Sequence, residues 1–432
     1  MSHATGSRYS HFVRNAALFL ALLMSGGNLF AYSVLTHEQV VDMAWGSEIQ
    51  PLLLLRFPEL TQDQIREAHA YAYGGSVIQD LGYYPFGSKN FSDLLHYVRS
   101  GDFVLELLRQ SQNANEYAFA LGALSHYTSD SDGHPAVNQA VAIGYPKLRA
   151  RFGRSVRYAQ DTTAHLKTEF GFDTLQVAKH RYASDQYHDF IGFKVSVPLL
   201  ERTFPVIYGL ELNDVLAHQA LAIGSYRFAV SQLIPEMTKV ALKTHKKSLM
   251  HEIPNFSRRK FLYRLSRSQY QKSWGSTYEK PSFFTRFLAA IVRFMPKIGP
   301  FKGLGFNNPT ATTEDMYIKS INTTVDQYRV FLKEVRSGNL VLPNRDLDDG
   351  QMTSPAEYTL ADETYATLLD MLAKGNFKET SPQLRDNILQ FYSDLSLPIH
   401  TKLDPARWQF VLTNLSALEA ATPSPVAVSP AP

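Results

Sequence analysis

The fold is decided by the stretch His126-Tyr127-Thr128-Ser129-Asp130-Ser131-Asp132-Gly133-His134-Pro135, which follows a run of small and apolar residues at 115–124. That run predicts a buried helix. His126 and Asp130 are four residues apart, so on a helix their side chains share one face, about one turn apart. The sequence therefore predicts a buried helix that presents an imidazole and a carboxylate side by side.

Gly133 and Pro135 predict that this helix ends here, with His134 just past its C-terminal end. Two imidazoles and a carboxylate at the tip of a buried helix are costly to leave unpaired. A metal ion would pair them, whereas a solvated helix end with chance histidines is the simpler alternative. The stretch by itself leaves both interpretations open.

The composition limits which metal ligands are available. The chain of 432 residues has no cysteine and fourteen histidines. The absence of thiols excludes disulfides, thiolate zinc sites and a lipoprotein anchor. Any metal must therefore be held by His, Asp, Glu or the backbone. The net charge of +3 is small and by itself implies no polyanionic partner.

Several segments differ in character. Residues 1–31 resemble a secretory signal peptide, because a basic start precedes a short apolar core and a plausible cleavage site after Ala31. This predicts an exported protein, periplasmic or extracellular, whose mature chain begins at Tyr32. The remainder shows helical patterning with little β alternation, so the predicted fold class is mostly α, a multi-helix bundle.

We expect a helical domain at 32–242, a basic aromatic-rich segment at 243–311, a helical C-terminal region at 312–420 and a disordered Pro/Ala-rich tail at 421–432. From Lys243 to Lys302 there are fourteen Lys or Arg and two acidic residues, with aromatic residues interleaved. Such a segment suits an anionic membrane surface or a nucleic-acid groove, or is an ordinary solvated basic face.

Nine residues in the N-terminal half have the chemistry of metal ligands and stand mostly near a helix start, a helix end or a turn. Each has an ordinary structural explanation when taken alone. Together they would supply three or four ligands for each of several metals. In chain order they are Tyr32, His37, Asp80, His96, His126, Asp130, His134, His165 and Glu169.

In order and spacing this set resembles the zinc-dependent phospholipase C family and the related single-strand-specific nucleases of the same superfamily. There the first mature residue binds zinc through its amino and carbonyl groups, a role that Tyr32 would take. The His-x-x-x-Asp motif is matched by His126 and Asp130, and the closing His-x-x-x-Glu motif by His165 and Glu169. The resemblance covers roughly residues 32–240. Tyr32 stands where the family usually has Trp.

The resemblance implies three zinc ions. The first would be held by Asp80, His96, His126 and Asp130. The second would be held by the Tyr32 amino and carbonyl groups, His37 and the bridging Asp130. The third would be held by His134, His165 and Glu169. The step from Asp130 to His134 is shorter than in the family, so Asp132 is an alternative bridging ligand.

The implied activity is phospholipase C-type hydrolysis, in which a metal-bound hydroxide cuts a phospholipid between glycerol and phosphate. Asp80 is also a candidate catalytic residue that orients or deprotonates the water. Two other functions fit the sequence. A zinc-dependent nuclease would act on single-stranded nucleic acid, although no base-binding signature accompanies the ligands. A non-catalytic, metal-stabilised module would bind a membrane or a protein partner.

Overall fold

The computed structural model describes residues 34–179, 181–183, 188, 191–230, 234, 238 and 308–422. These residues form helices and no strand, which confirms the mostly α prediction. The predicted signal peptide, Tyr32, the basic region at 243–307 and the tail from residue 423 lie outside the described residues.

The centre of the molecule is α7 (Ala114–Gly144), a helix of 31 residues. The Asn113 side chain caps its start by accepting a hydrogen bond from the Glu116 backbone N–H. Residues 116–130 are all buried, because helices cover this half from several sides. The predicted buried helix is therefore correct.

The predicted helix end at Gly133 and Pro135 is wrong, because α7 continues for another nine residues to Gly144. Proline at this position costs one hydrogen bond, the one its missing N–H would donate to the Ser131 carbonyl. Gly350, from the C-terminal half, lies against that carbonyl, so closely that a Cβ on Gly350 would be 2.2 Å from the Ser131 oxygen. This tertiary contact, together with the burial of Gly133 and His134, favours the helix continuing through the proline. His134 is consequently inside the helix.

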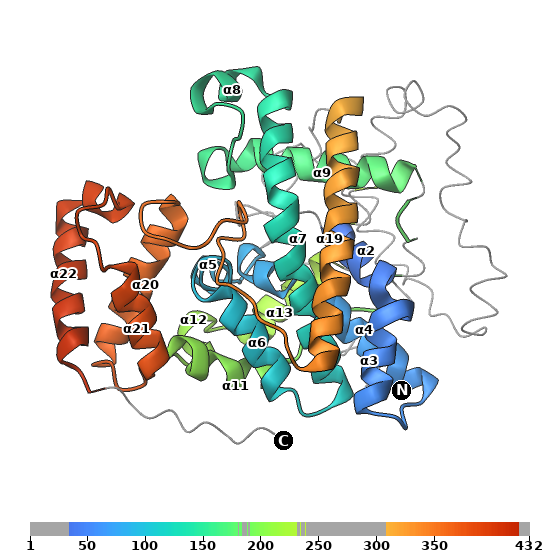
Figure 1. The fold of residues 1–432 in the computed structure, drawn as a ribbon, viewed down its shortest axis with the longest axis horizontal. Helices are drawn as coiled ribbons and strands as arrows, with labels where there is room; N and C mark the ends of the chain where they lie inside the picture. The colour runs from blue at the N-terminus through green and yellow to red at the C-terminus, as the bar shows by residue number, and fades with distance from the viewer. Residues whose placement is uncertain are drawn as a thin grey trace, which may run out of the picture.

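Two helices pack closely along α7 (Figure 1): α4 (Gln62–Gly75) and α19 (Ala311–Ser337). At the α4 crossing, a Cβ on Gly122 would lie 2.1 Å from the Ala72 carbonyl oxygen. Glycine at this position lets the two backbones approach. The α19 helix is tied in by Tyr328, whose hydroxyl donates to the Leu121 carbonyl at 2.8 Å.

Shorter helices surround this centre and carry the remaining candidate ligands. Toward the N-terminus they are α2 (Val34–Ala44), η1 (Trp45–Ile49), α3 (Gln50–Arg56), η2 (Ile78–Tyr83), α5 (Lys89–Tyr97) and α6 (Ser100–Gln110). After α7 come α8 (Pro146–Phe152), η3 (Tyr158–Gln160), α9 (Thr162–Ala178), α11 (Val197–Tyr208), α12 (Leu212–Val215) and α13 (Gln219–Phe228).

The C-terminal half is not a separate appendage. Within α19, the Tyr317 hydroxyl lies 2.5 Å from the Thr36 hydroxyl of α2, in the buried interior. Beyond α19 the chain turns back and contacts α6, α5 and α7 in turn. It then forms a lateral group of helices (Figure 1, red): α20 (Thr359–Lys374), α21 (Pro382–Phe391), η6 (His400–Leu403) and α22 (Pro405–Ala420). The domain boundaries at 243 and 312 stay predictions.

Candidate metal centre

Asp130 is the point on which four imidazoles converge. His126 Nε2 lies 2.9 Å and His96 Nε2 3.5 Å from its Oδ2, while His37 Nε2 lies 3.4 Å and His134 Nε2 3.7 Å from its Oδ1. All five side chains are fully buried. Neither oxygen of Asp130 has a hydrogen-bond partner of good geometry. A buried carboxylate in this state is expensive unless a cation completes it.

Backbone carbonyls fix the orientation of two of these rings. His126 Nδ1 lies 2.9 Å from the Ser76 carbonyl, and His96 Nδ1 lies 2.8 Å from the Ser92 carbonyl. Because a carbonyl only accepts, each Nδ1 must carry the proton. Nε2 is then the nitrogen of each ring that faces Asp130, and it is the one available to a metal ion.

Two compact groups of ligand atoms result. Asp80, on η2, places Oδ1 3.5 Å from His96 Nε2. The ligand atoms of Asp80, His96 and His126 all lie within 4.8 Å of one another, and so do those of His37, His126 and Asp130. The chemistry of both groups, imidazole nitrogen with carboxylate oxygen, fits zinc in the absence of thiolates.

The third predicted group lies between α7 and α9. The Asp161 side chain caps α9, and His165 and Glu169 then share one face, with His165 Nδ1 2.9 Å from Glu169 Oε1. His134 Nε2 lies 3.8 Å from the same oxygen. Asn138 Oδ1 contacts His165 Nε2 at 2.7 Å, which leaves Nδ1 for a metal. This group is more loosely spaced than the other two.

Burial and neighbouring charged groups shift the pKa values at this centre in both directions. Burial, together with the neighbouring His126, lowers the pKa of His37 well below its usual value. Burial raises the pKa of Glu169 well above its usual value. Burial and the adjacent His134 lower the pKa of His165 to about 3. Burial opposes protonation of His96, but Asp130 and Asp80 outweigh it and raise that pKa well above its usual value.

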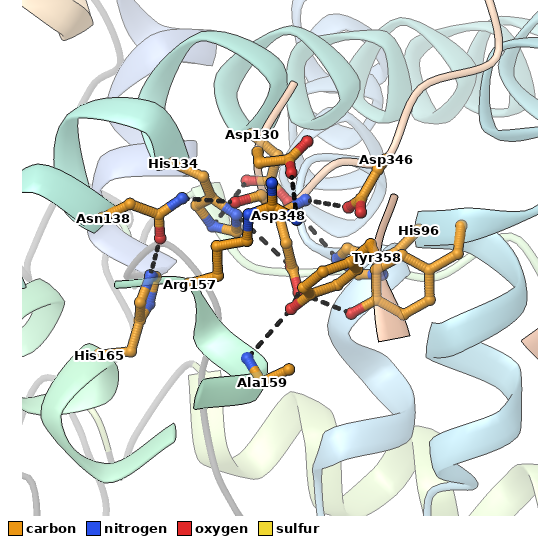
Figure 2. A network of polar contacts seen from close by, with 12 residues as sticks. His96, Asp130, His134, Asn138, Arg157, Ala159, His165, Asp346, Asp348 and Tyr358 are labelled. Atoms are coloured by element: carbon orange, nitrogen blue, oxygen red, sulfur yellow. Dashed lines mark hydrogen bonds and ion pairs between the residues drawn. The ribbon is translucent and has the colours of Figure 1, made fainter. Parts of the chain in front are cut away.

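One residue at the centre was not expected from the sequence. Asp348, from the segment after α19, is 2 % exposed and places Oδ1 3.6 Å from His134 Nδ1 (Figure 2). Burial alone would raise the pKa of Asp348, but His134 and Tyr358 lower it to about 2. In sequence, the run Asp346-Leu347-Asp348-Asp349-Gly350 has only the character of an acidic turn, so nothing local relates it to His134.

The same segment carries a third compact group, formed by Asp346, Asp349 and Glu357. Arg157 already lies against two of these carboxylates, 3.2 Å from Asp349 and 2.9 Å from Glu357. We therefore regard this group as an ion-pair network beside the centre.

Eight of the nine sequence-predicted residues come together in the structure, and Tyr32 lies outside the described residues. Between the two candidate bridging ligands, Asp130 faces the imidazoles, whereas Asp132 is half-buried at the edge of α7. The role of each residue as a ligand stays a prediction.

The segment that carries the candidate ligands is similar to a known protein family. Residues 36–217 match the family model for zinc dependent phospholipase C, a family of phospholipid-hydrolysing enzymes. The match is slightly shorter than the resemblance expected from the sequence, and it stops well before α19 and Asp348. No curated protein and no solved structure matches the chain. In the part of the chain that the structure describes, no helix is long and apolar enough to cross a bilayer.

Proposed function

We propose that the chain is an exported hydrolase that cuts phospholipids between glycerol and phosphate, because residues 36–217 match the zinc dependent phospholipase C family. The observation that carries the proposal is the convergence on Asp130. Four buried imidazoles lie 2.9–3.7 Å from this one carboxylate, inside the matched segment. A buried cluster of this kind is suited to holding more than one divalent metal ion.

We propose three zinc ions. Two would share Asp130, one with Asp80, His96 and His126, the other with His37 and the Tyr32 amino and carbonyl groups. The third would be held by His134, His165 and Glu169. Zinc supplies an activated water nucleophile and neutralises charge on the phosphoryl oxygens.

The chain's own residues would supply proton transfer and orientation. Asp80 is 1 % exposed and its Oδ1, which lies 3.5 Å from His96 Nε2, has no hydrogen-bond partner of good geometry, so it can ligate a metal or accept a proton from the attacking water. Tyr83 lies beside His96 and Tyr158 beside His165, with ring centroids 5.8 and 5.7 Å apart. Burial raises the pKa of both phenols well above the usual value, so they stay protonated and can donate to a phosphoryl oxygen.

The test is zinc content followed by substrate choice, on full-length secreted protein whose N-terminus is verified as Tyr32. We expect close to three zinc ions per chain and release of phosphocholine from phosphatidylcholine vesicles. One zinc or none would contradict the proposal. If the protein bound three zinc ions, degraded single-stranded DNA and released no phosphocholine, the proposed metals would stand but the substrate would be single-stranded nucleic acid. Zinc without either activity would favour the non-catalytic module.

A further inference from the structure

After α19 the chain returns to the metal centre as an irregular segment, residues 342–358, which we call the strap. Its backbone is bonded to the helices beneath. The Ser100 hydroxyl donates to the Arg345 carbonyl at 2.7 Å, and the Leu347 N–H donates to the His96 carbonyl at 3.2 Å. His96 is itself a candidate ligand. The strap is therefore a fixed part of the wall of the centre.

Two glycines allow the strap to lie this close. Gly350 has φ +74° and packs on the Ser131 carbonyl of α7. Gly101, at the start of α6, packs on the Pro343 carbonyl, so that a Cβ there would be 2.5 Å from the oxygen. Side chains at either position would push the strap away from the helices.

Within the strap, one oxygen of the Asp348 carboxylate is held by hydrogen bonds and the other faces His134. Its Oδ2 accepts hydrogen bonds from the Tyr97 hydroxyl at 2.8 Å and the Tyr358 hydroxyl at 2.6 Å. Its Oδ1 faces His134 Nδ1 at 3.6 Å (Figure 2). The backbone carbonyl of Asp348 also accepts from Asn138 Nδ2 at 2.9 Å. Both the side chain and the backbone are thus fixed.

This arrangement gives His134 a partner on its outer ring nitrogen, as His126, His96 and His165 have from other groups. The rings of His126 and His96 are oriented by backbone carbonyls, and the ring of His165 by Asn138. A carboxylate facing Nδ1 favours the tautomer with the proton there. Nε2, which points toward Asp130 and Glu169, is then left as the metal-binding nitrogen.

We propose that Asp348 is a positioning residue that orients His134 for the third zinc, so that a strap outside the matched family segment completes the centre. The inference rests on the proposed function, because it requires a metal at His134, His165 and Glu169. Through Asn138 the same strap residue is also linked to His165. The third site, the most loosely spaced of the three, would depend most on this support.

The test compares Asp348→Asn with the full-length wild type by zinc stoichiometry and by competitive chelator titration. We expect two zinc ions to stay bound as in wild type and the affinity for the third to fall about 10- to 100-fold. Tyr358→Phe keeps the carboxylate but removes one of its anchors, and should give a smaller loss. Retention of two zinc ions shows that the variant is folded.

The matched control is Asp349→Asn, the neighbouring strap residue, which contacts Arg157. We expect it to keep all three zinc ions. An equal loss of the third zinc in this control would overturn the inference, because strap integrity and not the Asp348 carboxylate would then be responsible. Unchanged affinity in Asp348→Asn would overturn it while leaving the proposed function standing. A wild type without zinc would overturn both.

Discussion

Asp130 differs from an ordinary buried aspartate in the number of basic groups around it. A buried ion pair usually matches one carboxylate with one cation and gains little net stability. Here four imidazoles face one carboxylate, and backbone carbonyls accept a hydrogen bond from Nδ1 of two of them, so that Nε2 of these rings faces Asp130. Burying these groups as an ion-pair network costs free energy, whereas the same groups are suitable metal ligands. A substitution at Asp130 is therefore the most direct test of metal binding.

Under the proposed ligand set, Asp130→Asn should remove a carboxylate that two zinc ions would share. We expect the zinc content to fall by two ions per chain and phosphocholine release to fall at least about 100-fold. The amide keeps the shape of the side chain, so a loss would reflect ligation. Elemental analysis of the purified variant measures the first effect and vesicle hydrolysis the second.

Asp132→Asn is the control on the same helix, because Asp132 is half-buried and does not face the imidazoles. It should keep its zinc and its activity. If Asp132→Asn lost zinc and Asp130→Asn did not, the bridging assignment would be reversed.

At the scale of elements, α7 serves two purposes along its length. Around Leu121 and Gly122 it packs against α19 and α4, and its middle carries His126, Asp130 and His134 on one face at successive intervals of four residues. The regular spacing of these three candidate ligands requires α7 to stay helical up to Pro135. Their position relative to α4 depends on the close approach of the two helices at Gly122.

Gly122→Ala should destabilise the fold because its Cβ would lie 2.1 Å from a backbone oxygen that cannot rotate away. Overpacking of this kind costs about 1–3 kcal/mol or more. Gly144→Ala, at the open end of the same helix with nothing within 4 Å, should be neutral or slightly stabilising. Urea unfolding of both metal-free variants against metal-free wild type measures the difference. Equal stabilities would contradict the close crossing.

On the scale of the whole molecule, the matched family segment and the C-terminal half share one interior. The Thr36 hydroxyl of α2 donates to Asp173 of α9 and also contacts Tyr317 of α19. Helices from the beginning, middle and end of the described chain thus meet at one buried point. Metal binding within this interior should stabilise the entire molecule.

Removal of zinc should therefore lower the thermal unfolding temperature of the whole chain. A ligand present at 1,000 times its dissociation constant stabilises the folded state by about 4 kcal/mol per site. We expect chelation to lower the midpoint by several degrees in calorimetry, and zinc, but not magnesium, to restore it. An unchanged midpoint after verified metal removal would mean that the buried carboxylates and imidazoles do not depend on a cation.

Patterns within a few residues were sufficient to predict the helices and the side-chain pairs that lie one turn apart on them. The helical class and the i, i+4 pairs His126–Asp130 and His165–Glu169 were predictable from the sequence, because helix periodicity acts over a few residues. The candidate ligands also emerged from sequence, through their resemblance to a family whose order and spacing they follow.

The tertiary structure was needed to show that the implied ligands lie together, and it alone revealed Asp348 beside them. Periodicity predicts that a helix face is buried but not which residues cover it, so the convergence of His37 and His96 on Asp130 had no local signal. The same holds for the continuation of α7 through Pro135. It holds most of all for Asp348, which lies far along the chain and reaches His134 because α19 packs against α7 and returns the strap to the centre.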